Sequence, residues 1–305
     1  MDNRSDVRAL PTSRRARVGP EQAGIPAYGN RRVAGLRCGE VAARRVGVWS
    51  TAGMDRSRLL HCLDAEVAQL RAAAARDLTA PVPTCPEWTV EELVRHVANF
   101  YLNVVVRRLH MPEDVPRVEL PPDALAALDR GYTAVVQDLA GRPPDEHVGQ
   151  MPHETVYYWT RRTTHETAIH RVDAELAVAG PVVPMPRDLA IDGIDEMLTG
   201  FLGELTRLFP EEFAAHLNDW DGNVVAVSAR DTAWWITVRP DGADVSRCDP
   251  GQVPDQATRA RVQGEPAELL YWLYNRAGND QVLTSGDDQL VAQLKRLLTA
   301  VTNTA

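Results

Sequence analysis

The sequence predicts an N-terminal four-helix bundle followed by a small α+β domain. Three observations support this prediction. Apolar residues recur at helical spacing in four successive segments after Met54. Beyond one further helix, the chain changes to short β-branched and aromatic runs. Its 305 residues are also enough for about two domains. We therefore assign residues 54–185 to the bundle and residues 186–305 to the second domain.

Residues 1–53 differ from the rest of the chain. They contain ten arginines against four acidic residues and mix Gly, Pro and Arg without helical or strand periodicity. Met54 stands immediately before the first well-patterned helix. We therefore expect residues 1–53 to be disordered or to precede the true translation start at Met54. A basic arm for nucleic acid or a membrane is the alternative interpretation of the same charges.

The first two helices have clear faces and ends. The first ends before the breaker run "APVPTCP". The second is expected to begin at about Val90, because Thr89 and Glu92 have the spacing of a capping box. The apolar face of the first helix comprises Leu60, Leu63, Val67, Leu70 and Ala74. The stripe of the second comprises Leu93, Val97, Phe100 and Val104.

Helices three and four complete the predicted bundle. The third lies between the turn-forming runs "LPPD" and "GRPPDE". Its apolar face comprises Leu125, Leu128, Tyr132, Val135 and Leu139. The fourth is expected from about Tyr157 to Ala179, where a Gly-Pro pair stops it. Four consecutive helices of this kind are typical of a bundle.

The second domain begins with a helix and continues with strands. One face of that helix comprises Ile194, Leu198, Phe201, Leu205 and Leu208. The runs "NVVAVSA", "AWWITVRP" and "ADVSRC" predict a meander, with the turn "PDG" between the last two. The strand "TRARVQG", the helix "EPAELLYWLYNR" and a closing helix through "DDQLVAQLKRLLTAV" follow. This order predicts a small α+β unit.

Composition limits the classes of function and location. From Met54 onward, 23 basic residues face 38 acidic ones, which argues against nucleic acid as a partner. No apolar run approaches the ~18–20 residues that cross a bilayer, and no signal peptide is recognisable. We therefore expect a cytoplasmic protein without a membrane partner. Four scattered cysteines (Cys38, Cys62, Cys85 and Cys248) indicate neither a disulfide framework nor a thiolate zinc cluster.

The fourth helix carries ionisable residues on its apolar face. Stepping 100° per residue aligns Glu166, His170 and Asp173 with Trp159, and Arg162 flanks the same line. The opposite side carries Arg161, Thr164, Arg171 and Glu175, which predicts a solvated face. In this orientation, three ionisable groups must meet inside the bundle.

The second helix supplies a matching residue, because His96 lies within its apolar stripe. Buried carboxylates and imidazoles must be paired or coordinate a metal. Glu166 and His170 project side by side at i and i+4, and His96 from a facing helix completes a His/His/carboxylate set with an open coordination position. Each residue also has a plainer interpretation, as a hydrogen-bonded core histidine or a solvated Glu–His pair. Asp173 and Arg162 are candidates for orienting the ligands from outside.

Two segments resemble a known family. "TCPEWTVEELVRHVANF" and "HETAIHRVDAE" are similar to the metal-binding domain of mycothiol-dependent maleylpyruvate isomerases, a branch of the DinB-like four-helix bundles. The similarity continues through "AIDGIDEML" to "GEPAELLYWLYNRAG", which resembles the family's C-terminal domain and implies a sterol-carrier-like unit. It also implies a divalent metal held by His96, Glu166 and His170. Arg276 would bind substrate, although Asn275 stands where the family usually has Gly.

The resemblance implies an enzyme that uses mycothiol as thiol cosubstrate on a small-molecule substrate. A metal with an open position lowers the pKa of a thiol. In the family's reaction, as the resemblance implies, the thiol adds to a cis enedioic acid, the former double bond becomes free to rotate, and elimination of the thiol gives the trans isomer. Two imidazoles and a carboxylate suit zinc, although iron and nickel accept the same ligands.

Two other functions remain open at this level. The first is thiol S-transfer to an electrophile. The second is a non-catalytic metal-binding or ligand-binding module, for which the adjacent Trp234 and Trp235 offer an aromatic contact surface. The sequence leaves the oligomeric state open.

Overall fold

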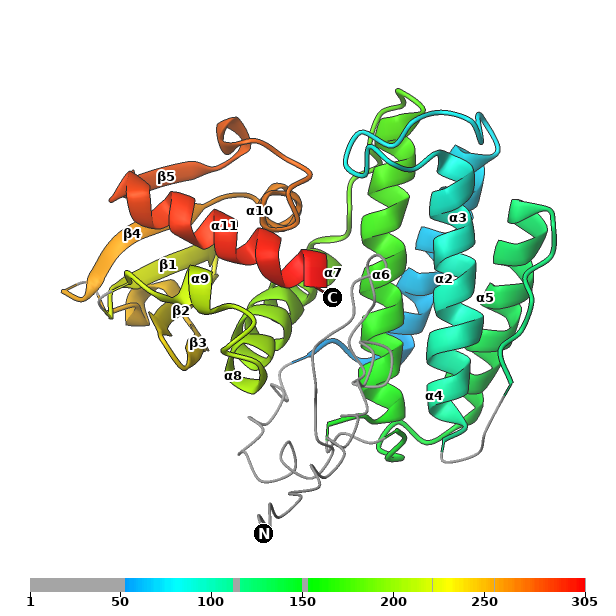
Figure 1. Ribbon diagram of the computed structural model, residues 1–305, viewed down its shortest axis with the longest axis horizontal. Coiled ribbons are helices and arrows are strands. Elements are labelled where there is room, and N and C mark those ends of the chain that lie inside the picture. Colours follow the sequence, from blue (N-terminus) through cyan, green and yellow to red (C-terminus); the bar gives the residue numbers. More distant parts are fainter. Residues whose placement is uncertain (1–52, 112–115, 150–152, 221, 255, 305) are drawn as a thin grey trace, which may run out of the picture.

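The computed structural model describes residues 53–111, 116–149, 153–220, 222–254 and 256–304. The expectation for residues 1–53 therefore lies outside the described residues, Gly53 apart. Figure 1 shows a helical part beside a part that contains a sheet. None of the helices among the described residues combines the length and apolar character needed to span a membrane.

The helical part is the predicted bundle. Its elements are α2 (Arg56–Ala74), α3 (Val90–Asn99), η2 (Phe100–Val106), α4 (Arg107–Leu109), α5 (Ala124–Gly141) and α6 (Val156–Ala177). The elements α3, η2 and α4 follow one another without a break, so the bundle has four long helical rods (Figure 1). The bundle expected from the sequence is confirmed.

Side chains fix the starts of these helices. The carboxylate of Asp55 accepts from the backbone N–H groups at the start of α2. Thr89 and Glu92 form the predicted capping box, so α3 begins at Val90 as expected. Asp123 and Thr155 cap α5 and α6 in the same way. Each cap satisfies backbone donors that a helix start leaves without partners.

The second rod changes its winding within the predicted apolar stripe. From Phe100 to Val106 it is a π-helix, with more residues per turn than an α-helix. The inward face therefore rotates. Tyr101 and Val105 are fully buried, whereas the predicted stripe residue Val104 is only partly buried. A fixed 100° step cannot anticipate such a change of winding.

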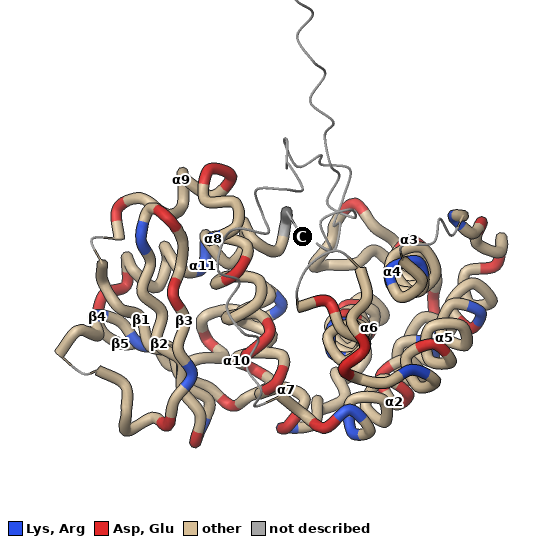
Figure 2. The backbone as a smooth tube through the Cα atoms, turned by 90° about the horizontal axis from the view of Figure 1, so that it is seen from below, with Lys and Arg blue, Asp and Glu red and all other residues tan. Residues whose placement is uncertain are grey.

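One prediction for the fourth helix is wrong, because α6 has no solvated face. Arg161, Thr164, Arg171 and Glu175 are all buried. The cause is that α6 contributes to two cores, with Trp159 in that of the bundle and Ile169 in that of the second part. Its charged residues form ion pairs with other residues instead of facing water. Figure 2 shows α6 between the other helices of the bundle and the helices of the second part.

The second part is the expected α+β domain. Its helices are α7 (Arg187–Asp195), η3 (Glu196–Leu205), α8 (Thr206–Leu208), α9 (Ala214–Leu217), η4 (Pro250–Gln252), α10 (Pro266–Leu273), η5 (Asn279–Gln281) and α11 (Asp288–Thr304). Its strands are β1 (Val224–Ala229), β2 (Thr232–Arg239), β3 (Gly242–Cys248), β4 (Thr258–Gln263) and β5 (Leu283–Gly286). The sterol-carrier likeness and the domain boundaries at 54, 185 and 186 stay predictions.

The sheet has the strand order β3-β2-β1-β4-β5. β1, β2 and β3 form the predicted antiparallel meander, whereas β4 pairs parallel to β1 and antiparallel to β5. The sequence did not indicate β5, which consists of four exposed residues at the edge of the sheet. In Figure 2, α7 and α10 lie between the sheet and the bundle. The segment that follows α10 therefore lies beside α6.

Candidate metal centre

The sequence-predicted ligands converge inside the bundle. Glu166 and His170 lie one turn apart on α6, and His96 lies in the last turn of α3. The Nε2 atom of His96 is 3.1 Å from Oε1 of Glu166, and Nε2 of His170 is 3.2 Å from the same oxygen. One donor atom from each residue lies within 4.8 Å of the other two. The side chains of Glu166 and His170 are fully buried, and that of His96 is 16% exposed.

A carboxylate lies beside the second imidazole. Nδ1 of His170 is 3.0 Å from Oδ2 of Asp173, one turn further along α6. A proton on Nδ1 makes this hydrogen bond, which leaves Nε2 directed at the cluster. Thr84 donates to Asp173 Oδ1 at 2.6 Å from the segment before α3. Asp173 therefore lies beside His170, and its orienting role stays a prediction. Thr84 is a further contact of Asp173 that the sequence did not indicate.

The other oxygen of Glu166 accepts a hydrogen bond from an arginine. Arg162 donates from Nη2 to Oε2 of Glu166 at 2.7 Å, which leaves Oε1 for the histidines. The same guanidinium pairs with Glu196, the first residue of η3, and stacks 5.0 Å over the ring of Phe201. Arg162 thus contacts Glu166, and its role in orienting a metal ligand stays a prediction. The involvement of Glu196 was missed, since a glutamate next to an apolar helix face is ordinarily taken as solvated.

An aromatic ring covers one side of the cluster. The Trp88 ring centroid lies 4.9 Å from that of His96 and 6.4 Å from that of His170. The sequence placed Trp88 only at the start of the second helix. Its ring limits access of water to the histidines, which strengthens electrostatic interactions there.

Burial and neighbouring charges shift the pKa values in the cluster. Burial lowers the pKa of His96. Burial also opposes charge on His170, but the hydrogen bonds of Asp173 and Glu166 outweigh it and raise its pKa to about 9. For Glu166, burial acts to raise the pKa, and His170, His96 and Arg162 together hold it well below its usual value. The cluster therefore keeps one carboxylate ionised in a fully buried position, where it needs cationic neighbours.

The residues fit a divalent metal. Two imidazole nitrogens and one carboxylate oxygen form the donor set of catalytic zinc sites, which keep a fourth position open. The non-ligating atoms of two donors already have partners, Asp173 for His170 and Arg162 for Glu166. Such outer contacts are typical of metal sites, because they fix the direction of the lone pairs.

The predicted substrate residue Arg276 lies beside the cluster and makes an ion pair. It donates from Nε and Nη2 to the two oxygens of Asp173 at 2.9 and 2.8 Å, and from Nη1 to the carbonyl of Tyr274. The second domain thereby contacts the residue that orients His170. A substrate-binding role for Arg276 stays a prediction.

The chain reaches Arg276 through a left-handed residue. Asn275 has φ of 61° after the end of α10, and the Arg276 N–H bonds back to the carbonyl of Tyr271. A helix end of this kind ordinarily uses Gly, and Asn is the next most tolerant residue. Nδ2 of Asn275 also donates to Thr299 at 2.9 Å. The departure from Gly in the sequence is therefore accommodated without loss of the turn.

Four helical rods around a buried His/Glu/His cluster define the class of the N-terminal part, a four-helix bundle with a candidate metal site. Residues 59–175 match the family model described as the mycothiol maleylpyruvate isomerase N-terminal domain. This segment belongs to that domain family, as the resemblance in the sequence indicated. All three cluster residues lie within the matched range.

Two solved structures are also similar to the chain. One is a crystal structure of the mycothiol-dependent maleylpyruvate isomerase, with 15% identity, coverage of 77% of this chain and 95% of that chain, and a TM-score of 0.49. The other is a histidine-to-alanine mutant of a mycothiol-dependent maleylpyruvate isomerase, with 14% identity, the same coverages and a TM-score of 0.48. A search of curated proteins gave no significant match.

Proposed function

We propose that the protein is a metal-dependent enzyme of the maleylpyruvate isomerase type, with mycothiol as its thiol cosubstrate. One observation carries the proposal. In a bundle of this domain family, donor atoms of His96, Glu166 and His170 lie within 4.8 Å of one another. Zinc is the metal we favour, because two imidazoles and a carboxylate suit its preferences.

A divalent metal at this site supplies Lewis acidity, which lowers the pKa of a thiol at the open position. The chain's own residues prepare that site. Asp173 holds the Nδ1 proton of His170, and Arg162 directs Glu166 so that Oε1 faces both histidines. Trp88 restricts water on the side of His96. No side chain of the protein is required as a nucleophile, because the thiol of the cosubstrate takes that role.

A second candidate is mycothiol S-transfer to an uncharged electrophile. One observation favours it. Both arginines that the sequence placed near the site already form ion pairs with carboxylates of the protein. Arg276 pairs with Asp173, and Arg162 pairs with Glu166 and Glu196. Isomerisation of a dicarboxylate needs cations for the substrate carboxylates, whereas transfer to an uncharged electrophile does not.

The experiment combines metal content with two activities. Purified full-length protein is digested, and its metals are measured by mass spectrometry. The zinc-loaded protein is then assayed with mycothiol on maleylpyruvate and, separately, with mycothiol on an epoxide. Isomer formation that requires both zinc and mycothiol supports the first function. Thioether formation without isomerisation supports the second. Protein that neither contains nor takes up metal contradicts both.

A further inference from the structure

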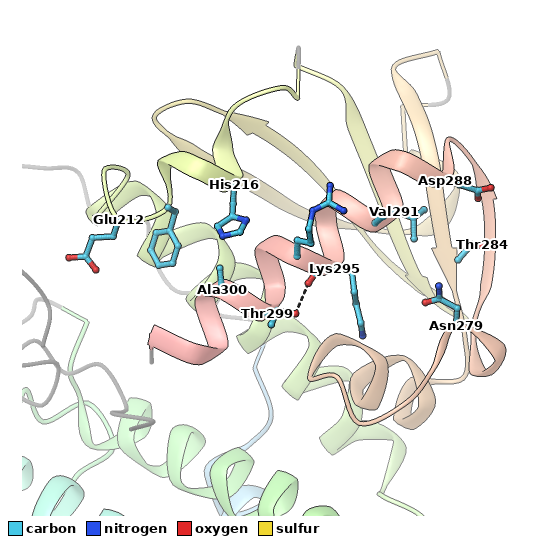
Figure 3. Close-up of a pocket in the computed structure, with 12 residues that line it drawn as sticks. Glu212, His216, Asn279, Thr284, Asp288, Val291, Lys295, Thr299 and Ala300 are labelled. Atoms are coloured by element: carbon cyan, nitrogen blue, oxygen red, sulfur yellow. Dashed lines mark hydrogen bonds between the residues drawn. The ribbon is translucent and has the colours of Figure 1, made fainter. Parts of the chain in front are cut away.

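A cavity lies in the α+β domain. It has a volume of about 840 Å³ and is bordered by α9, α11 and the segment from η5 to β5. This volume falls within the range of small-molecule sites, roughly 300–1,000 Å³. None of its lining residues belongs to the His96, Glu166 and His170 cluster. Figure 3 shows the side chains of this cavity.

The cavity contains the one lysine of the sequence. Lys295 is the single lysine among 33 lysine and arginine residues. Its Nζ lies 4.2 Å from the ring centroid of Trp272 and donates to the carbonyl oxygen of the same residue. The Trp272 indole in turn donates to Asn279 Oδ1 at 2.8 Å. Trp272 is fully buried, so it holds two polar lining residues in fixed positions.

Burial makes the charge of Lys295 unfavourable, despite its contacts with Trp272. Burial, with a smaller contribution from the charge of Arg276, lowers the pKa of its ammonium to about 8. Within the part of the chain that the structure describes, no ion pair involves Lys295 or the neighbouring lining residues His216 and Arg296. A partly buried cation without an anionic partner is costly, and an anion bound beside it would offset that cost.

The acidic residues of the cavity lie at its margins. Figure 3 shows Glu212 and Asp288 at opposite ends, with both carboxylates directed away from Lys295 and His216. The centre therefore favours one negative group, and the ends disfavour a second one. Phe213 and Val291 are buried apolar residues of the same lining, so the site also offers an apolar surface.

We propose that this cavity binds a small organic carboxylate, with its head group at Lys295 and its apolar part against Phe213 and Val291. The head group also lies within the positive field of Arg296. This site is independent of the thiol chemistry proposed for the bundle.

The single lysine makes the test selective. Full-length protein is treated with limiting acetic anhydride at pH 8, with and without octanoate, and acetylation of Lys295 is followed by peptide mass spectrometry. Octanoate at ten times its Kd is expected to slow acetylation roughly tenfold, because only about one site in eleven is then free. Octanoate is also expected to raise the Tm of the wild type.

Matched variants locate the effect. Lys295→Met is expected to abolish the rise in Tm, and Arg296→Gln to weaken octanoate binding at least threefold. Arg259→Gln, which removes another exposed arginine of the same domain, is expected to leave binding unchanged. His170→Ala is expected to keep the octanoate effect, which separates this site from the proposed metal centre.

Three results would overturn the proposal. The first is unchanged acetylation of Lys295 at 10 mM octanoate. The second is equal protection by inorganic phosphate, because the apolar part would then contribute nothing. The third is equal weakening by Arg259→Gln and Arg296→Gln. The acetylation measurement uses wild-type protein, so it stands even when Lys295→Met folds poorly.

Discussion

The Nε2 atom of His96 lies 3.1 Å from Oε1 of Glu166, although the two residues are 70 positions apart in the chain. The contact joins the last turn of α3 to the middle of α6 and brings an imidazole to a fully buried carboxylate. His170 approaches the same oxygen from the next turn of α6.

Replacing His170 with alanine is expected to reduce bound metal from about one per chain to less than about a tenth, since two remaining ligands hold a metal weakly. His165→Ala is the matched control. His165 is the same residue type on α6, is equally buried and pairs with Asp192 at 2.7 Å, away from the cluster. Metal content of both purified variants, checked for folding by circular dichroism, decides the assignment. Equal losses would reject His170 as a ligand.

Arg162→Met is expected to weaken zinc binding about 10–100-fold, as loss of an orienting contact commonly does. Its guanidinium holds Oε2 of Glu166, and without it the carboxylate is free to rotate. Zinc affinity is measured by competition with a chromophoric chelator. Arg161→Met serves as control, because Arg161 also makes buried ion pairs, with Asp192 and Asp195, but does not bond Glu166. An unchanged affinity in Arg162→Met would rule out the orienting role.

Asn275→Ala is expected to destabilise the protein by about 1–2 kcal/mol, because alanine adopts the left-handed conformation at that cost. Asn275→Gly should remain within about 1 kcal/mol of the wild-type free energy of unfolding. Glycine adopts the left-handed conformation without steric cost, and this gain offsets the loss of the hydrogen bond to Thr299. Urea unfolding of both variants gives the two free energies. A glycine variant that is as unstable as the alanine variant would show that the side-chain bond, and not the backbone, sets the stability.

Lys295 is expected to make stability depend on pH in the alkaline range. Its pKa is about 8 in the folded protein, below the ordinary value of 10.5, so the folded state binds the proton less tightly than the unfolded state. The cost of the buried charge is complete below pH 8 and disappears as the pH rises toward 10.5. Wild type should therefore gain about 1 kcal/mol relative to Lys295→Met between pH 7 and pH 10, a value discounted for partial solvent exposure.

The measurement is the free energy of unfolding of wild type and Lys295→Met at both pH values. The difference between the two proteins removes the contribution of other groups that titrate in this range. A difference that stays constant, or that changes in the opposite direction, would contradict the depressed pKa of this lysine.

The sequence by itself determined the helices of the bundle, the meander and the ligand candidates. These features depend on local periodicity and on the spacing of residues along one helix, as for Thr89 and Glu92 at a helix start or Glu166 and His170 on one face. The strand β5 was missed because its four residues are exposed and form a strand only by pairing with β4.

Only the tertiary structure decided what surrounds α6. This helix lies between two cores, so the arginines that its sequence assigned to solvent are buried and paired, and Glu196 and Thr84 join the cluster from distant segments. The tertiary structure also pairs Arg276 with Asp173 and places Lys295, the one lysine, beside Trp272. Periodicity indicates which side of a helix is apolar, but the partners of a buried charge depend on which other elements pack there.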